Sequence, residues 1–297
     1  MPLILVTGAT GTVGSRTVER LVSSPGVVVR AAVHRRAAAL RVPGVEHVRI
    51  EFRDLESLQA AMAGVDAVFL VTPSGPDEAE LAVQAVDAAA SVGVRRLVRL
   101  SGFCAERPHD VQFMRQHLDV ERAIAVSGIP FTFVRPQRYM ENFITDHVPG
   151  PDGAIRLPWG SAGVSLIATD DVADFAARVL TSDGHLGWCY TITGPAPITV
   201  AQVAAFISAA TGRRVTYLDT AEAVTRSAML ARGLPPRVVD PMLALFASCK
   251  AGRHAGVTTT FSEMTGRAPR SFSDFARQHA DAWWSADPRV GAQQSNR

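Results

Sequence analysis

The stretch LILVTGATGTVG, residues 3–14, decides the fold of this chain. An apolar segment typical of a buried strand leads directly into a turn with three glycines, and a helical pattern follows. In such a turn the glycines let the backbone approach a pyrophosphate closely, and the first N–H groups of the helix point at its negative charge. A tight turn without a ligand is the alternative interpretation. The position between strand and helix favours a nucleotide-binding turn made by Gly8, Thr10, Gly11, Thr12, Val13 and Gly14.

Apolar segments rich in β-branched residues alternate with helical segments through the first half of the chain. We predict strands over residues 3–6, 27–33, 47–50, 67–71, 96–100 and 131–134. We predict helices over 13–22, 77–92 and 111–126, and one more that starts after Asp54. Apolar strands that are each followed by a helix predict a parallel sheet covered on both faces. With right-handed crossovers, this is a doubly wound α/β sheet, the Rossmann fold.

After Pro136 the pattern changes, because residues 137–163 contain many aromatic, proline and glycine residues. A strand over 165–169, a helix over 171–180 and a strand over 190–193 follow, and then helices over 200–211, 220–231, 236–247 and 272–284. We therefore predict a nucleotide-binding domain of residues 1–136 plus 164–193 and a smaller, mainly helical substrate-binding domain of residues 137–163 plus 194–285. Residues 286–297 form a polar tail that we expect to be flexible.

Composition excludes several classes of function. The net charge of the 297 residues is only +2 and no long basic run occurs, so we expect no nucleic-acid partner. The three cysteines lie far apart without metal spacing, and neither HExxH nor GxSxG occurs, so we expect no metal and no such hydrolase. With no signal peptide and no apolar run of about 20 residues, we expect a cytoplasmic protein without a membrane partner.

The tip of the second predicted strand indicates which nicotinamide nucleotide binds. In the pattern typical of NAD, an acidic residue about 20 positions past the glycines binds the ribose 2′-hydroxyl. Here that position is His34, followed by Arg35 and Arg36. A carboxylate would repel a 2′-phosphate, whereas a guanidinium can bind it with two hydrogen bonds. We expect these three residues to bind the cofactor and NADP(H) to be preferred over NAD(H), with a solvated basic loop as the alternative.

Over about residues 1–285 the chain resembles the NmrA-like branch of the atypical short-chain dehydrogenase/reductase superfamily. The motifs that carry this resemblance are TGATGTVG (7–14), GVDAVF (64–69), VE (120–121), SGIPFTFVRP (127–136), MENF (140–143), DVA (171–173) and TGR (265–267). Bacterial members of the family include NADPH-dependent quinone and azo reductases. Other members are NADP(H)-binding redox sensors with little or no catalysis.

Ordinary short-chain reductases carry Tyr-x-x-x-Lys on the helix after the fifth strand, with both side chains on the helix face beside the nicotinamide. Here that helix reads FMRQH over residues 113–117, so Phe113 replaces the tyrosine and His117 the lysine. Ser101 matches the usual serine. The resemblance implies that Ser101 and His117 are the candidate catalytic residues and contact the cofactor, with His117 at the ribose and able to transfer protons. A half-exposed surface histidine is the alternative for His117.

The missing tyrosine indicates the class of substrate. Reduction of a simple ketone creates a strongly basic alkoxide that needs a proton donor, whereas reduction of a quinone creates a delocalised, weakly basic anion. We therefore predict an NADP(H)-dependent oxidoreductase that reduces a quinone-like or conjugated aromatic acceptor by direct hydride transfer. Two alternatives stay open: a non-catalytic NADP(H) redox sensor that binds a regulatory partner, and a tailoring enzyme of aromatic natural-product biosynthesis.

Further candidates have a structural alternative. Thr72 and Pro73 follow the fourth strand, where family members approach the adenosine or pyrophosphate, or they only end the strand. Asp54 is a candidate contact of the adenine, although capping a helix through the Asp54-x-x-Ser57 pattern is simpler. We expect a small aromatic or quinoid substrate, and leave a homodimer open. Core packing is the commoner fate of the aromatic residues that we consider as substrate-binding, which are Phe113, Tyr139, Phe143 and Trp159.

Overall fold

The computed structural model describes residues 1–34, 42–103, 105 and 111–283, and within these the chain divides into two units. Unit 1 comprises Met1–Pro136, Thr169–Ile192 and Thr260–Gly266. Unit 2 comprises Gln137–Ala168, Thr193–Thr259 and the described residues from Arg267 onward. Residues 260–266, which we expected in the second domain, therefore belong to unit 1, and 164–168 belong to unit 2. The predicted tail at 286–297 lies outside the described residues.

Unit 1 is built on a sheet of seven parallel strands in the order β3-β2-β1-β4-β5-β6-β8. The predicted doubly wound α/β fold is thus confirmed. Apolar side chains fill the central strands, and all four residues of β4 are buried. The strands are β1 (Leu3–Val6), β2 (Val28–Val33), β3 (Glu46–Arg49), β4 (Ala67–Leu70), β5 (Arg96–Leu100), β6 (Phe131–Pro136) and β8 (Cys189–Ile192).

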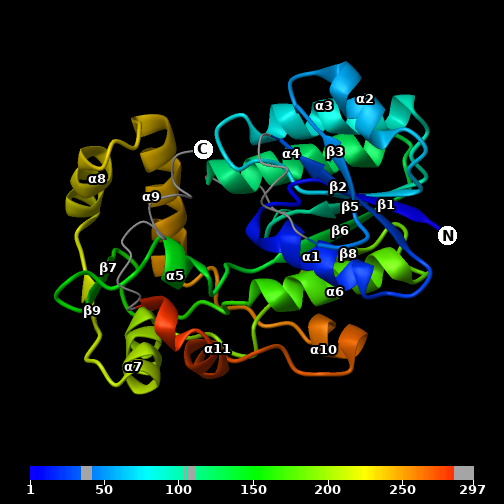
Figure 1. The fold of residues 1–297 in the computed structure, drawn as a ribbon. Helices are drawn as coiled ribbons and strands as arrows, with labels where there is room; N and C mark the ends of the chain where they lie inside the picture. Colours follow the sequence, from blue (N-terminus) through cyan, green and yellow to red (C-terminus); the bar gives the residue numbers. More distant parts are fainter. Residues whose placement is uncertain (35–41, 104, 106–110, 284–297) are drawn as a thin grey trace. The chain divides into compact units, whose positions relative to one another are not determined.

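Helices cover both faces of this sheet. They are α1 (Thr12–Val22), α2 (Leu55–Met62), α3 (Glu78–Ser91), α4 (Gln112–Val126), α6 (Thr169–Thr181) and α10 (Thr260–Thr265). Figure 1 shows α2, α3 and α4 on one face and α1 and α6 on the other. Arg20 of α1 fixes this second pair, because its guanidinium contacts Asp170 (2.6 Å) and Asp174 (2.7 Å) of α6.

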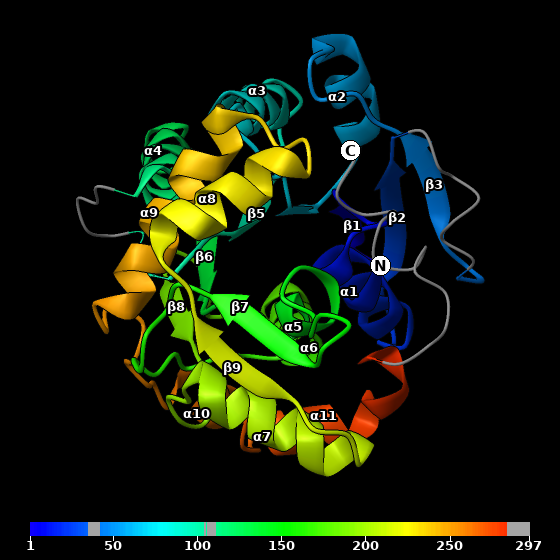
Figure 2. The same cartoon turned by 90° about the vertical axis from the view of Figure 1, so that its left-hand side faces the viewer.

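Unit 2 combines a small sheet with helices. β7 (Ala154–Leu157) pairs in parallel with β9 (Thr216–Asp219), and Figure 2 shows the two strands side by side. Helix α7 (Val200–Thr211) begins with a capping box between Thr199 and Gln202. It ends at Gly212, whose φ is +68°. The helices are α5 (Asn142–Thr145), α7 (Val200–Thr211), α8 (Glu222–Ala231), α9 (Pro236–Lys250), α11 (Phe272–Gln278) and the short 3-10 helix η2 (Ala280–Trp283).

Two sequence-based predictions are wrong in unit 2. The strand expected over 165–169 is irregular backbone with single bridges, such as the one between Ile167 and Tyr139. Its apolar residues are buried, but Ser165 bonds to the backbone of residues 254 and 255 and not to a strand. The helix expected over 272–284 ends at Gln278. None of the helices in the described residues is both long and apolar enough to cross a bilayer.

Candidate functional site

The glycine turn of unit 1 has the geometry that the sequence predicts. Gly8 has a φ of +60°, and its carbonyl accepts a hydrogen bond of 2.9 Å from the Gly11 N–H. A Cβ atom on Gly14 would lie 2.1 Å from the same carbonyl oxygen, so only glycine fits there. Gly11 begins α1 without a side-chain cap, and no acidic residue occupies the first turn of this fully described helix. The turn therefore offers backbone N–H groups to an anion, which fits the pyrophosphate of a dinucleotide.

The ends of β1 and β4 are tied together behind this turn. The Thr7 hydroxyl donates to the Val71 carbonyl (2.8 Å) and accepts from the Val71 N–H (2.8 Å). These two hydrogen bonds hold the ends of β1 and β4 together. The topological switch point of the sheet lies between these strands, and ligands bind there in doubly wound sheets. Of the other turn residues, Thr10 is exposed, Thr12 is half-buried and Val13 is buried.

The tip of β2 is only partly described. His34 is exposed, and its Nε2 lies 2.6 Å from Glu51 Oε2. Arg35 and Arg36 lie outside the described residues. Asp54 caps α2, as its Oδ1 accepts from the Ser57 N–H (3.1 Å), which confirms the capping interpretation and leaves an adenine contact as a prediction. Pro73 is exposed after β4.

Ser101 belongs to a buried network at the carboxyl ends of β5 and β6. Its hydroxyl donates a 2.6 Å hydrogen bond to Glu121 Oε1 on α4. Arg135 at the end of β6 holds both oxygens of the same carboxylate, with Nε–H donating over 2.8 Å and Nη2–H over 2.5 Å. All three side chains are buried, so the serine proton is already directed at a fixed carboxylate.

His117 lies beside a second buried network. Its imidazole packs on Gly102, where a Cβ atom would lie 2.4 Å from Cδ2 of the ring. Its buried Nδ1 is 3.7 Å from Glu78 Oε1 at the start of α3 and has no hydrogen-bond partner among the described residues. Arg99 of β5 donates to that same Glu78 oxygen (2.7 Å) and to the Thr72 hydroxyl (2.9 Å).

The surroundings of His117 favour its neutral form. Burial lowers the pKa of the imidazole most strongly, and the Arg99 guanidinium lowers it further. The carboxylates of Glu78 and Glu121 raise it, but the pKa stays below the ordinary 6.5. At neutral pH the ring is therefore uncharged and has one N–H and one free acceptor nitrogen.

The predicted substrate-binding residues lie in both units. Phe113 is a half-buried residue of α4, one turn before His117. In unit 2, Tyr139 is half-buried, whereas Phe143 and Trp159 are packed into the core with 0% and 2% of their surface exposed. A role of these rings in binding substrate stays a prediction.

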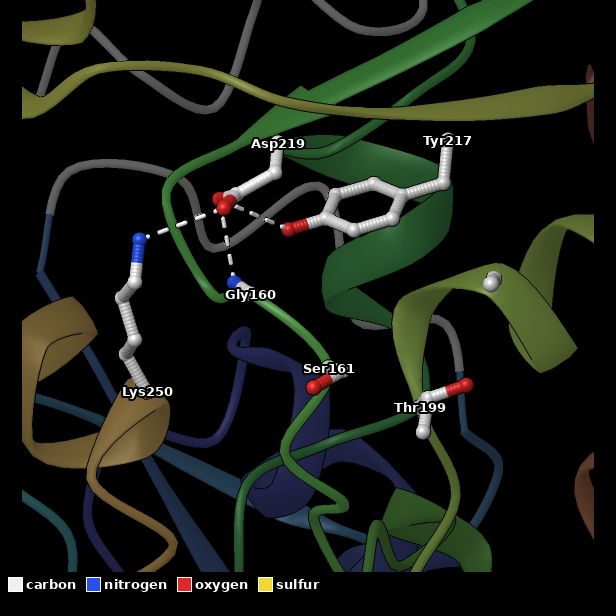
Figure 3. Close-up of a pocket in the computed structure, with 7 residues that line it drawn as sticks. Gly160, Ser161, Thr199, Tyr217, Asp219 and Lys250 are labelled. Carbon is white, nitrogen blue, oxygen red and sulfur yellow. Dashed lines mark hydrogen bonds and ion pairs between the residues drawn. The ribbon is translucent and has the colours of Figure 1, made fainter.

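Unit 2 also contains a surface cavity of about 600 Å³ that the sequence did not suggest. Asp219 organises it: it accepts from the Gly160 N–H (3.0 Å) and from Lys250 Nζ (3.2 Å), and its Oδ1 lies 3.2 Å from the Tyr217 hydroxyl (Figure 3). Burial, and then the Asp219 charge, raise the pKa of Tyr217 to about 12. The dashed lines in Figure 3 join Asp219 to Lys250, Gly160 and Tyr217, and none of the lining residues is a predicted site residue. Ser161, Thr199 and Ala201 complete the lining.

Glu78, Arg99 and Glu121 were missed as site residues. A charged residue within the apolar strand RLVRL (96–100) was the one available signal, since an arginine in a central strand needs a buried partner. The partner could not be identified, because Glu78 comes 21 positions earlier on another element. No group of acidic, histidine and cysteine residues suited to a metal ion occurs in the described part of the chain.

Comparison with known proteins identifies the family of the chain and agrees with its fold. The model of the NmrA-like family matches residues 2–275. A (4-alkanoyl-5-oxo-2,5-dihydrofuran-3-yl)methyl phosphate reductase of Streptomyces griseus is 38% identical, with 95% of this chain and 99% of that protein covered. An NAD(P)H azoreductase of Xenophilus azovorans is 36% identical over 96% of this chain and 100% of its own. The structure of an NADPH-dependent quinone oxidoreductase from Escherichia coli complexed with NADPH is 26% identical, with a TM-score of 0.84 and coverage of 93% and 99%.

Proposed function

The chain belongs to the NmrA-like family and is an oxidoreductase that uses a nicotinamide cofactor, and from this premise we propose that it reduces acceptors whose reduction leaves a delocalised, weakly basic anion. Quinones and conjugated aromatic compounds are such acceptors. The bound cofactor supplies the hydride. The residues of this chain hold the cofactor and acceptor in place and provide hydrogen bonds.

The Ser101–Glu121 hydrogen bond is the observation that carries this proposal. In a ketone reductase the serine and a tyrosine together stabilise a basic alkoxide. Here the Ser101 hydroxyl donates to Glu121, and the three tyrosines of the chain, at positions 139, 190 and 217, are all outside α4. The site around Ser101 is therefore poorly suited to protonating an alkoxide. It is suited to a product anion that takes its proton from water.

His117 has a positioning role in this proposal. Its depressed pKa makes a charged imidazolium scarce at neutral pH, so the ring is a weak acid. A neutral ring, fixed against Gly102, can instead hydrogen bond to a cofactor hydroxyl. We therefore favour the ribose contact over proton donation, and we expect Phe113, one turn earlier, to contact the acceptor.

We also propose that NADP(H) is preferred over NAD(H). The sequence His34-Arg35-Arg36 at the end of β2 supports this preference, because guanidinium groups bind a phosphate with paired hydrogen bonds. The His34–Glu51 pair places one carboxylate near this tip, so the preference depends on the two arginines. Replacing both with serine should weaken NADPH binding on the order of a hundredfold and leave NADH binding nearly unchanged. An equal loss for both nucleotides would contradict the assignment.

The test of the main proposal is a comparison of acceptors. We expect steady NADPH oxidation with ortho-naphthoquinone and menadione, and none above the protein-free rate with cyclohexanone or acetophenone. The variant Phe113→Tyr restores a phenol on α4 and serves as the matched control for ketone reduction. Turnover of simple ketones by the unmodified protein would contradict the proposal. Tight NADPH binding without turnover of any acceptor would favour a non-catalytic redox sensor.

A second candidate substrate class follows from the relative in Streptomyces griseus. The name of that reductase describes an unsaturated lactone with an acyl group on the ring and a phosphate ester. Reduction of such a conjugated system would also leave a stabilised anion, so the same site chemistry suffices. A tailoring reductase of a natural-product pathway is therefore the second candidate. An unsaturated acyl lactone in the acceptor panel separates the two candidates. A higher kcat/KM for the lactone than for the quinones favours the tailoring reductase.

The remaining expectations concern partners and location. We propose a small-molecule acceptor and no nucleic-acid partner, because the net charge is only +2. We further propose a reduced, cytoplasmic environment, since the three cysteines of the chain lie far apart in the sequence and show no spacing typical of a disulfide framework. Sedimentation of the purified protein would decide between a monomer and a homodimer.

A further inference from the structure

Arg138 lies in unit 2, two positions after the last residue of β6. Its guanidinium carbon is 5.0 Å from the centre of the Trp159 ring and 5.9 Å from that of Phe246. Both rings contact His147 within a buried aromatic group. We call these four residues, Arg138, His147, Trp159 and Phe246, the Arg138 cluster.

The Arg138 cluster contains two buried donors without acceptors. Arg138 Nε and Trp159 Nε1 are both inaccessible to solvent, and neither has a hydrogen-bond partner among the described residues. No carboxylate of the described chain forms an ion pair with Arg138 either. Buried polar groups in folded proteins are nearly always paired, so two unpaired donors in one cluster call for an explanation.

The electrostatics of the cluster agree with an unneutralised cation. Burial lowers the pKa of His147 to about 3, and Arg138 and then Arg232 also lower it. Arg138 also acts on Cys249, whose pKa it lowers against the larger effect of burial. A nearby carboxylate would offset these effects, and none contributes at His147.

The Arg138 guanidinium lies over the Trp159 ring, and because Arg138 as a whole is only half-buried, part of its side chain is accessible to a ligand. A guanidinium stacks on aromatic rings through its flat face, and its N–H donors all lie in the perpendicular edge. That edge matches the oxygens of a carboxylate or phosphate, which it binds with two parallel hydrogen bonds. A structural arginine of this kind usually has an acid partner in the chain, as Arg99 and Arg135 do in unit 1.

We propose that Arg138, whose guanidinium lies over the Trp159 ring, binds an oxyanion group (phosphate, carboxylate or sulfonate) of a small molecule. The subsite belongs to unit 2 and needs no residue of unit 1 to bind the anion.

Direct binding tests the subsite independently of catalysis. We would titrate phenyl phosphate and benzoate into the full-length protein by calorimetry and expect saturable binding of both. Arg138→Gln should weaken binding at least about tenfold, because hydrogen bonds to a charged group are lost. Arg138→Lys keeps the charge but not the paired donors, so its affinity should lie between those of the unmodified protein and Arg138→Gln. The matched control is Arg237→Gln, which removes a charge from an exposed residue of α9 and should bind like the unmodified protein.

Each result of this titration decides the subsite. Absence of binding to the unmodified protein overturns it, and so does an equal loss in Arg138→Gln and Arg237→Gln, which would indicate general charge attraction. Retained NADPH binding checks that Arg138→Gln is folded. If this variant does not fold, Arg138→Lys decides: affinity equal to that of the unmodified protein overturns the paired geometry.

Discussion

Three arginines, two in unit 1 and one in unit 2, differ in what they contact. In unit 1, Arg99 and Arg135 each hold a buried carboxylate, Glu78 and Glu121, and through it Thr72 or Ser101. In unit 2, Arg138 lies on aromatic rings, with a buried donor left unpaired among the described residues. Each of the two arginines in unit 1 therefore has an acid partner within the chain, whereas no ion pair of the described residues involves Arg138. The first arrangement suits a fixed part of the fold, and the second leaves a cation for the anion that we propose it binds.

The first prediction concerns the glycine turn of unit 1, which is built from backbone. In Gly14→Ala the new Cβ would lie 2.1 Å from the Gly8 carbonyl oxygen and 2.7 Å from its carbon, so the turn itself must move. We expect NADPH affinity to fall on the order of a hundredfold, because the backbone no longer approaches the pyrophosphate. Calorimetry measures this, and Gly75→Ala, where nothing lies within 4 Å, is the control. Equal affinities in the two variants would show that the turn does not hold the cofactor.

The second prediction compares Arg99, which has an acid partner, with Arg138, which lies over aromatic rings. Arg99→Met leaves Glu78 buried without its ionic partner, so we expect unfolding free energy to fall by about 3–5 kcal/mol. Arg138→Met leaves no orphan carboxylate and removes an unpaired donor, so stability should stay within about 1 kcal/mol of the unmodified protein. Urea denaturation measures both. A similar loss in the two variants would mean that Arg138 is a structural residue.

Features of this molecule could be predicted from the sequence where the residues that form them are neighbours in the chain. The glycine turn was predictable because strand, turn and helix form one continuous segment, and the cap of α2 by Asp54 was predictable for the same reason. The Glu78–Arg99 pair joins residues 21 positions apart, and spacing alone does not identify such partners. Likewise, Phe143 and Trp159 were recognisable as aromatic, but their direction depends on packing across unit 2. The four-residue strands β7 and β9 are too short for any periodicity to reveal.

A third, smaller effect concerns pH and the cations around His147. Its pKa is about 3 in the folded protein, against 6.5 ordinarily, so below pH 6.5 only the unfolded chain takes up this proton. Stability is therefore lost as pH falls from 6.5 toward 3, by about 2 kcal/mol at pH 5.

The variant His147→Phe should remove this contribution, and urea denaturation at pH 7 and pH 5 measures the difference from the unmodified protein. His34→Gln, at the exposed end of β2, serves as the control. Saturating phenyl phosphate should make the pH dependence shallower if it neutralises Arg138, which acts on His147. An unchanged pH dependence in His147→Phe would contradict the buried, neutral state of this ring.

The smallest expected effect is on kcat/KM in Gly102→Ala. It distinguishes a role in positioning His117 from a role in the stability of unit 1. In Gly102→Ala the new Cβ would lie 2.4 Å from Cδ2 and 2.8 Å from Nε2 of His117, and because a side chain can move aside, the fold should tolerate it. The displaced imidazole should lower kcat/KM for quinones about tenfold, since small misplacements at a reacting centre are costly. In a His117→Ala background the same substitution should have almost no further effect, because the two residues act as one unit. An undiminished loss in that background would mean that Gly102 matters through its own backbone, leaving His117 a surface residue of α4.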